Sequence, residues 1–137
     1  MTISHSEKIN CTENQLWQLL LEKITNPEYT IKEVSKSKIL ESFSDGYLRE
    51  MNVSGMHIVE RIIVSSETKE IIFNLVDNIE FEGYIINKIE NKNDDVILTY
   101  LQEWKPKNSS IQYSQNQFLI TIKNSVLAMK KLAEQNL

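Results

Sequence analysis

Apolar side chains recur at two different spacings along this chain of 137 residues, and the change of spacing divides the chain into parts. In the last quarter, from Ile111 to Leu137, the step is three or four residues, which places the apolar side chains on one face of a helix. No Gly or Pro interrupts this stretch, and a helix of its full length would be about 35–40 Å long. We predict a helix covering roughly Ser114 to Glu134. Its apolar stripe contains Phe118, Ile122, Val126, Met129 and Ala133.

Between Lys36 and Trp104 the apolar side chains alternate with polar ones, a period of two that is typical of strands. Turn signals such as Asp45-Gly46 and Ser54-Gly55 separate the runs by only a few residues. Strands joined by such short links pair with their neighbours as an antiparallel meander. The predicted strands are Lys36–Phe43, Tyr47–Val53, Met56–Ser65, Glu70–Val76, Glu80–Glu90 and Val96–Trp104.

The first third of the chain predicts a strand and two helices. Residues 2–10 alternate weakly between apolar and polar types, as an edge strand does. Thr12 and Gln15 form a capping box that starts a helix, and this helix ends at Asn26-Pro27. The same pair restarts a short second helix, because Asn caps well and Pro suits the first helical position. The stripe of the first helix contains Leu16, Leu19, Leu20 and Ile24.

Together these elements predict an α+β fold in which a curved antiparallel sheet of about seven strands wraps around the long C-terminal helix. Two short helices follow the first strand. No linker, repeat or low-complexity tract divides the chain, so we expect one domain over residues 1–137. A chain of this length buries one core without disulfides or metals.

The turn at Ser54-Gly55 fixes which residues oppose each other in its hairpin, because a hairpin sets the register of both strands. The more apolar face of this hairpin is expected to point inward, and it holds an opposed Arg and Glu at its centre. The predicted cross-strand pairs on that face are Val53–Met56, Met51–Ile58 and Arg49–Glu60.

A turn at Lys92-Asn93 is predicted for the last hairpin. Its inner face is apolar and aromatic apart from Asn87 and Gln102. Gly83 leaves this lining without a side chain where bulk is expected, so we predict that it makes room for a cavity. The predicted pairs are Phe81–Trp104, Gly83–Gln102, Ile85–Tyr100, Asn87–Leu98 and Ile89–Val96.

The order of elements resembles the helix-grip fold of the Bet v1-like and START-like (SRPBCC) proteins. Several short motifs narrow this resemblance, namely Gln15-Leu16-Trp17, Asn26-Pro27, Arg49-Glu50, Glu60-Arg61, Glu82-Gly83 with Asn87, and Glu103-Trp104. Through these motifs the chain resembles the AtaL-like family over nearly its whole length. The resemblance implies a hydrophobic cavity between the sheet and the long helix, and no activity that can be carried over residue by residue.

Arg49 and Glu60 form the sharpest candidate site. One interpretation is a polar anchor inside an apolar pocket, in which Arg49 holds a carboxylate, phenolate or enolate of a ligand. The other is a structural ion pair, since charged groups are rarely buried without a partner. Asn87 and Gln102 either bond a ligand or bond each other or a trapped water. Tyr100 and Trp104 are interpreted as lining.

Composition and charge argue against several classes of binding partner. A net charge of −4 gives no general affinity for phosphate backbones, so no nucleic-acid partner is expected. The longest apolar runs are far too short for a membrane span, no signal peptide is evident, and the lone Cys11 fits a reducing cytoplasm. His5 and His57 have no second ligand at metal spacing, and three glycines exclude most phosphate loops. We therefore expect no metal and no cofactor.

Three functions follow from this sequence. The leading hypothesis is the binding of a small hydrophobic or aromatic molecule by a carrier or sensor, with no catalytic residue assigned. The second is implied by the resemblance, because the superfamily includes polyketide cyclases and aromatases. In such an enzyme Arg49, Glu60 and Tyr100 would steer an enolate. The third is also implied by the resemblance, since some helix-grip domains modulate chaperones; such an interaction module would have a solid interior. The ligand's identity and the oligomeric state stay open. The predicted ligand-binding residues are Arg49, Met51, Ile58, Glu60, Phe81, Gly83, Ile85, Asn87, Tyr100, Gln102 and Trp104.

Overall fold

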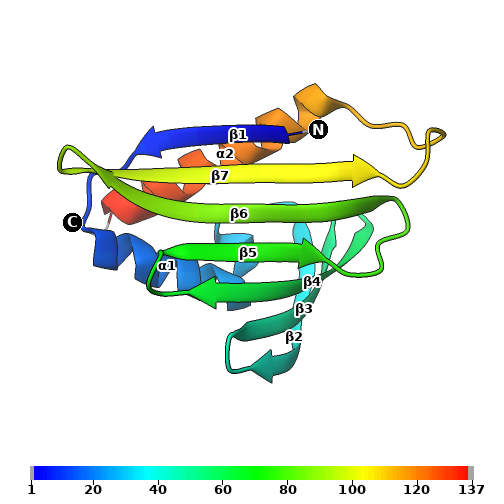
Figure 1. The fold of residues 1–137 in the computed structure, drawn as a ribbon, viewed down its shortest axis with the longest axis horizontal. Helices are drawn as coiled ribbons and strands as arrows, with labels where there is room; N and C mark the ends of the chain where they lie inside the picture. The colour runs from blue at the N-terminus through cyan, green and yellow to red at the C-terminus, as the bar shows by residue number, and fades with distance from the viewer. Residues whose placement is uncertain (1, 136–137) are drawn as a thin grey trace.

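The computed structural model describes residues 2–135, so the last two positions of the predicted C-terminal stretch lie outside the described residues. Its two α-helices and seven strands follow the predicted order (Figure 1). The strands are β1 (Thr2–Lys8), β2 (Val34–Phe43), β3 (Gly46–Val53), β4 (Met56–Ser65), β5 (Glu70–Leu75), β6 (Phe81–Lys92) and β7 (Asp95–Pro106). The helices are α1 (Glu13–Thr25), the 3-10 helix η1 (Pro27–Tyr29) and α2 (Gln115–Gln135).

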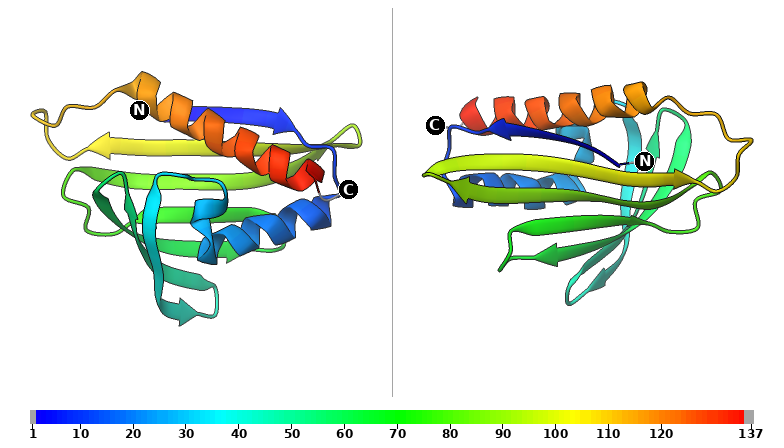
Figure 2. Two further views of the ribbon diagram at one scale, coloured as in Figure 1. Left: turned by 180° about the vertical axis from the view of Figure 1, so that it is seen from behind. Right: turned by 45° about the horizontal axis from the view of Figure 1, so that its top comes forward.

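All seven strands form one antiparallel sheet in the order β1-β7-β6-β5-β4-β3-β2. Strands β2 to β7 are the predicted meander, and β1 closes the other edge by pairing with β7. Both α-helices lie on one face of the sheet, and the strands β2 to β4 turn away from the plane of β6 and β7 (Figure 2). This is the α+β helix-grip architecture that the sequence predicts.

Local signals in the sequence set the helix ends. The side chains and backbones of Thr12 and Gln15 bond each other in both directions, which confirms the capping box at the start of α1. The hydroxyl of Ser114 accepts a hydrogen bond from the backbone N–H of Gln117 at the start of α2. Asn26 differs from the prediction: its side chain donates to the carbonyl of Glu22 and does not cap η1.

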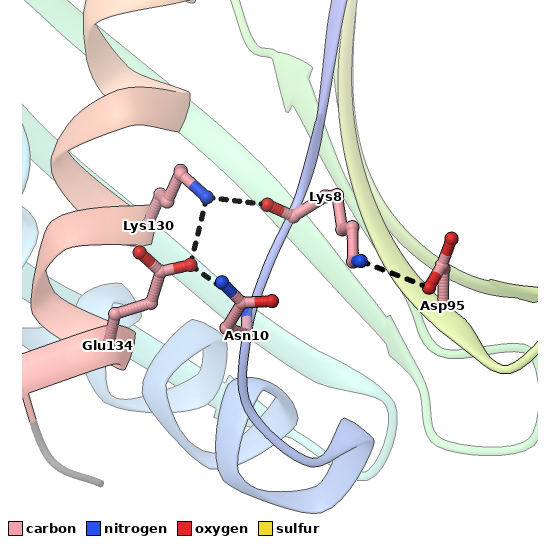
Figure 3. Close-up of polar contacts among 5 residues, drawn as sticks. All are labelled: Lys8, Asn10, Asp95, Lys130 and Glu134. Carbon is pink, nitrogen blue, oxygen red and sulfur yellow. Dashed lines mark hydrogen bonds and ion pairs between the residues drawn. The ribbon is translucent and has the colours of Figure 1, made fainter.

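The C-terminal half of α2 is tied to the link between β1 and α1 (Figure 3). Lys130 donates from Nζ to the backbone carbonyl of Lys8 at 2.7 Å and pairs with Glu134 at 2.8 Å. The same Glu134 carboxylate accepts the backbone N–H of Asn10 at 2.8 Å. These contacts fix one end of α2 against the sheet, while its first half lies over the cavity described below.

The core consists of two apolar clusters. The larger cluster joins α1, the part of α2 from Ile122 onward and the centre of the sheet. The smaller one contains Met51, Ile58, Phe81 and Trp104, and Phe118 of α2 packs against it. The Trp104 and Phe118 rings meet edge to face at 5.6 Å between centroids, a favourable geometry for aromatic pairs.

The register predicted for the β3–β4 hairpin is confirmed. Arg49 lies opposite Glu60, Met51 opposite Ile58 and Val53 opposite Met56. The face that carries them points inward, since Arg49, Met51, Ile58 and Glu60 are all buried.

The register predicted for the last hairpin is wrong by two residues. Asn93 and Asp94, not Lys92 and Asn93, occupy the centre of the turn, with φ of 52° and 69°. A two-residue hairpin turn of this kind needs positive φ at both positions, which Asn and Asp tolerate better than most residues. A shift of two residues leaves every side chain on the same face of the sheet, so the residues predicted to face inward are unchanged. The observed pairs are Gly83–Trp104, Ile85–Gln102, Asn87–Tyr100 and Ile89–Leu98, and Phe81 lies opposite Pro106.

The role predicted for Gly83 is also wrong. Its φ is +130°, and a Cβ at this position would lie 1.9 Å from the backbone carbonyl oxygen of Glu103 on β7. Glycine is therefore required here by the close approach of two backbones, and it does not open space for a ligand.

We predict that Gly83→Ala destabilises the protein more than Gly55→Ala does. Both glycines have positive φ, so both changes carry the backbone cost of about 1–2 kcal/mol. Only Gly83 adds a clash, worth about a further 1–3 kcal/mol, because nothing lies within 4 Å of a Cβ at Gly55. Urea denaturation of both variants measures the difference, and equal losses would contradict the close approach.

Candidate functional site

A cavity of about 450 Å³ lies between the inner face of the sheet and the first half of α2. Residues of both apolar clusters line it, among them Phe73 of the larger cluster and Trp104 of the smaller one. Exposed residues of the loop after η1, of the β3–β4 turn and of α2 mark its outer rim, namely Glu33, Ser54 and Gln117. The volume is within the range of small-molecule sites.

Nine of the eleven residues predicted from the sequence line this cavity. The two exceptions are Phe81 and Gly83. Phe81 is buried beside Trp104, with 5.5 Å between ring centroids. It therefore packs against a residue of the cavity wall and does not line the cavity itself. The nine are Arg49, Met51, Ile58, Glu60, Ile85, Asn87, Tyr100, Gln102 and Trp104.

Sequence reasoning missed the contribution of the helices and of β5. The first half of α2 supplies one wall, with the polar Thr121 and Ser125 beside the apolar Phe118 and Ile122. The most consequential omission is Lys23 of α1. A signal for it existed: Lys23 follows Leu16 by seven residues and Leu20 by three, which places it on the buried stripe of its helix. The other lining residues not predicted are Ile31, Glu33, Val53, Ser54, Met56, Phe73 and Gln117.

Arg49 and Glu60 form a buried ion pair at the inner end of the cavity. The Nη2 of Arg49 lies 2.6 Å from Oε1 of Glu60, and both side chains are only 4% exposed. The Nη1 of Arg49 donates at 3.0 Å to the carbonyl oxygen of Ile24, in the last turn of α1. That carbonyl has no partner within its own helix, so Arg49 satisfies a helix end as well as a carboxylate. The structure thus gives the pair a structural role.

Lys23 lies beside this pair without a carboxylate of its own. Its Nζ donates to the hydroxyl of Tyr100 at 3.1 Å, and it lies 4.3 Å from the centroid of the Tyr100 ring and 5.1 Å from that of Phe73. Among residues 2–135, no acidic side chain forms an ion pair with it. Burial, and to a lesser extent the charge of Arg49, lowers the pKa of Lys23 to about 7, against a smaller raising effect of Glu60.

Burial also raises the pKa of Tyr100 well above its ordinary value, so this phenol keeps its proton at neutral pH. Tyr100 can therefore accept a hydrogen bond from Lys23 and donate one to a bound group. The inner end of the cavity combines a proton donor, a titrating amine and a fixed ion pair within an apolar wall.

Three buried polar atoms of the cavity residues have no hydrogen-bond partner within the described part of the chain. They are Nε of Arg49, Oδ1 of Asn87 and Nε1 of Trp104. Asn87 therefore does not bond Gln102 through its carbonyl oxygen, which was one of the two interpretations from the sequence. Unpaired buried polar atoms cost stability, so a hydrogen-bonding group that enters the cavity and reaches these three atoms would be favoured.

Nothing in residues 2–135 forms a metal site, since no three His, Cys, Asp or Glu side chains gather there. Cys11 packs against the larger core cluster, and burial raises the pKa of its thiol. This fits a packed thiol and not an activated one. No helix within the described range is both long and apolar enough to cross a membrane.

Comparison with protein families decides where the chain belongs. The family described as acetylaranotin biosynthesis cluster protein L, or AtaL, matches residues 3–135. The chain belongs to the AtaL family. A comparison with curated proteins found no match.

Solved structures extend the likeness of this AtaL-family protein at the level of fold. A START superfamily protein from Mycobacterium smegmatis is 14% identical, with a TM-score of 0.77 and 99% of each chain covered. A major latex-like protein from Panax ginseng is 15% identical, with a TM-score of 0.77 and 97% of each chain covered. The Zhui aromatase/cyclase from a Streptomyces species is 11% identical, with a TM-score of 0.73, and the match covers 98% of this chain and 94% of that one. The AtaL-family fold is thus that of the START and Bet v1-like proteins.

We predict that Arg49→Met costs about 3–5 kcal/mol of unfolding free energy, because it strands the buried Glu60 carboxylate and the Ile24 carbonyl. Adding Glu60→Leu to this variant should recover much of that loss. A double-mutant cycle, with unfolding free energies from denaturation, measures the recovery.

The matched control is the solvent-accessible pair of Arg61 on β4 and Asp45 in the β2–β3 turn. Nη2 of Arg61 lies 2.5 Å from Oδ1 of Asp45, and the side chains are 27% and 54% exposed. Asp45→Asn removes one charge of this pair and should cost far less than Arg49→Met, because water solvates the ion that is left. If Arg49→Met lowered the unfolding free energy no more than Asp45→Asn does, the Arg49–Glu60 pair would be solvated like the surface pair, which would contradict its burial.

We also predict that stability rises with pH between about 7 and 9. The pKa of Lys23 is lowered in the folded protein, so the unfolded chain binds more protons in this window and the folded state gains as the pH rises. The slope contributed by Lys23 is at most about 1.4 kcal/mol per pH unit. Urea denaturation at pH 7, 8 and 9 measures it, with Lys23→Met as the control. An unchanged slope in that variant would show that Lys23 is not the group responsible.

Proposed function

We propose that this protein binds a small, largely apolar or aromatic molecule in the cavity, as a carrier or sensor. The observation that carries this proposal is the cavity itself: about 450 Å³ between sheet and α2, apolar at its walls and polar at its inner end. Such a combination orients a ligand by a few polar groups and binds it by apolar contact. An interior built only for stability would fill this volume, since cores pack closely.

The comparisons support the same class of function in general terms. The family name links its members to a biosynthetic cluster, and therefore to small molecules. The chain shares its fold with a START superfamily protein and with an aromatase/cyclase. A protein-interaction module would need no cavity, so the hollow interior favours ligand binding over that class.

A second candidate function is that of a polyketide cyclase or aromatase. One observation favours it: Arg49, Glu60 and Tyr100, the residues that would steer an enolate, all line the cavity. With its pKa raised, Tyr100 would act as a hydrogen-bond donor to a developing oxyanion and not as a base. Incubation with a poly-keto substrate separates the two candidates, because a carrier returns the substrate unchanged.

We further propose that the chain is one domain and works in the cytoplasm without a nucleic-acid or membrane partner. The negative net charge and the single cysteine support this.

We predict that Ser125→Phe sharply weakens ligand binding. Ser125 is buried on the cavity side of α2, so a phenyl group there fills empty volume. The dissociation constant for the neutral fluorescent dye N-phenyl-1-naphthylamine should rise at least about tenfold, with little loss of stability. In a solid interior the same change would overpack the core and cost about 1–3 kcal/mol.

The control is Asn124→Phe, one residue earlier and exposed, which should leave dye binding unchanged. Native mass spectrometry of the freshly purified protein provides the independent readout, since a carrier or sensor retains its ligand. Loss of stability in Ser125→Phe with unchanged dye binding would overturn the cavity as a binding site.

A further inference from the structure

When Lys23 is protonated, the inner end of the cavity carries one more positive than negative charge. Lys23 and Arg49 are its cations and Glu60 is the carboxylate beside them. Arg49 is already committed, because its two Nη groups bond Glu60 and the carbonyl of Ile24. Lys23 is the cation that remains, with only the Tyr100 hydroxyl and two aromatic rings in contact.

No other ionisable group of the cavity wall compensates Lys23. The sheet contributes Arg49, Glu60 and Tyr100, and burial keeps Tyr100 a neutral phenol. Glu33 lines the rim and is exposed to solvent. The polar residues that α2 places on the cavity are Gln117, Thr121 and Ser125, and none of them ionises.

A buried ammonium without a counterion is costly, and two events can relieve the cost. The amine can lose its proton, which the pKa of about 7 permits near neutral pH. Alternatively, an anion can enter the cavity and pair with the ammonium. The two events compete for the same group, so they are thermodynamically linked.

We propose that the ligand carries an acidic oxygen group, such as a carboxylate, enolate or phenolate, that pairs with Lys23 at the inner end of the cavity, and that binding proceeds with uptake of one proton by Lys23. This inference rests on the proposed function and names the chemistry of its ligand. The proton comes from solvent and forms a third N–H bond as the neutral amine becomes an ammonium. No covalent bond forms between the ligand and the protein. Tyr100 positions the Lys23 nitrogen and donates a hydrogen bond from its hydroxyl to the bound oxygen.

Two dyes that differ by one anionic group test this. The anion 1-anilinonaphthalene-8-sulfonate has the ring system of N-phenyl-1-naphthylamine plus a sulfonate, which stands in for the acidic oxygen group. Fluorescence titrations of both dyes at pH 7, 8 and 9 give their dissociation constants. Between pH 8 and 9 the affinity for the sulfonate dye should fall about tenfold, because the protonated fraction of free Lys23 falls by that factor. The affinity for the neutral dye should stay constant.

Calorimetry in buffers of different ionisation enthalpy counts the protons directly. Binding of the sulfonate dye at pH 8 should take up about one proton per site. The variant Lys23→Met should lose this uptake and the pH dependence, and should bind the sulfonate dye at least about tenfold more weakly at pH 7. Its binding of the neutral dye should persist, which shows that the variant is folded and its cavity open.

The outcomes separate this inference from the proposed function. If neither dye binds, the proposed function fails. If the neutral dye binds and the sulfonate dye binds no more tightly, with no proton uptake, Lys23 has only a structural role and the inference is overturned. If Lys23→Met loses both dyes, the milder Lys23→Gln decides: the inference stands if this variant restores the neutral dye alone, and falls if it restores both dyes or neither.

Discussion

The contacts of Arg49 join α1 to the inner face of the sheet at the centre of the protein. Its guanidinium pairs with Glu60 on β4, bonds the last turn of α1 through the Ile24 carbonyl, and lies 5.4 Å from the ring centroid of Phe73 on β5. A charged group in this position stays buried only if every partner remains, since losing one leaves another uncompensated. The end of α1 is therefore fixed against the inner face of the sheet.

This constraint also explains the position of Lys23. Lys23 precedes Ile24 in α1, so the bond that fixes the Ile24 carbonyl fixes the backbone beside it. The Lys23 side chain is thereby directed over Tyr100 and Phe73 at the inner end of the cavity. The ion pair and the amine are thus parts of one arrangement, in which the pair stabilises the fold and holds Lys23 in the buried position that, together with the charge of Arg49, lowers the pKa of the amine.

Much of this fold could be predicted from the sequence because its signals are local. The Ser54-Gly55 turn, with φ of 50° and 81°, fixes the β3–β4 register and with it the Arg49–Glu60 pair. The last hairpin was misplaced by two residues because two neighbouring dipeptides both suit a turn, and only backbone geometry selects Asn93-Asp94. Gly83 was misread for a related reason: a glycine required by a close backbone approach looks the same in sequence as one that leaves space.

The site was harder to predict than the fold, because its decisive group is on another element. Strand alternation shows which residues of a hairpin share a face, but not which helix residue meets them. Lys23 looks like an ordinary polar residue of an amphipathic helix unless its place on the stripe of Leu16 and Leu20 is weighed against its charge. Burying a lysine without a carboxylate costs stability, and an apolar residue would pack the same position more favourably. Stability alone therefore does not account for Lys23, whereas an anionic ligand that pairs with it does.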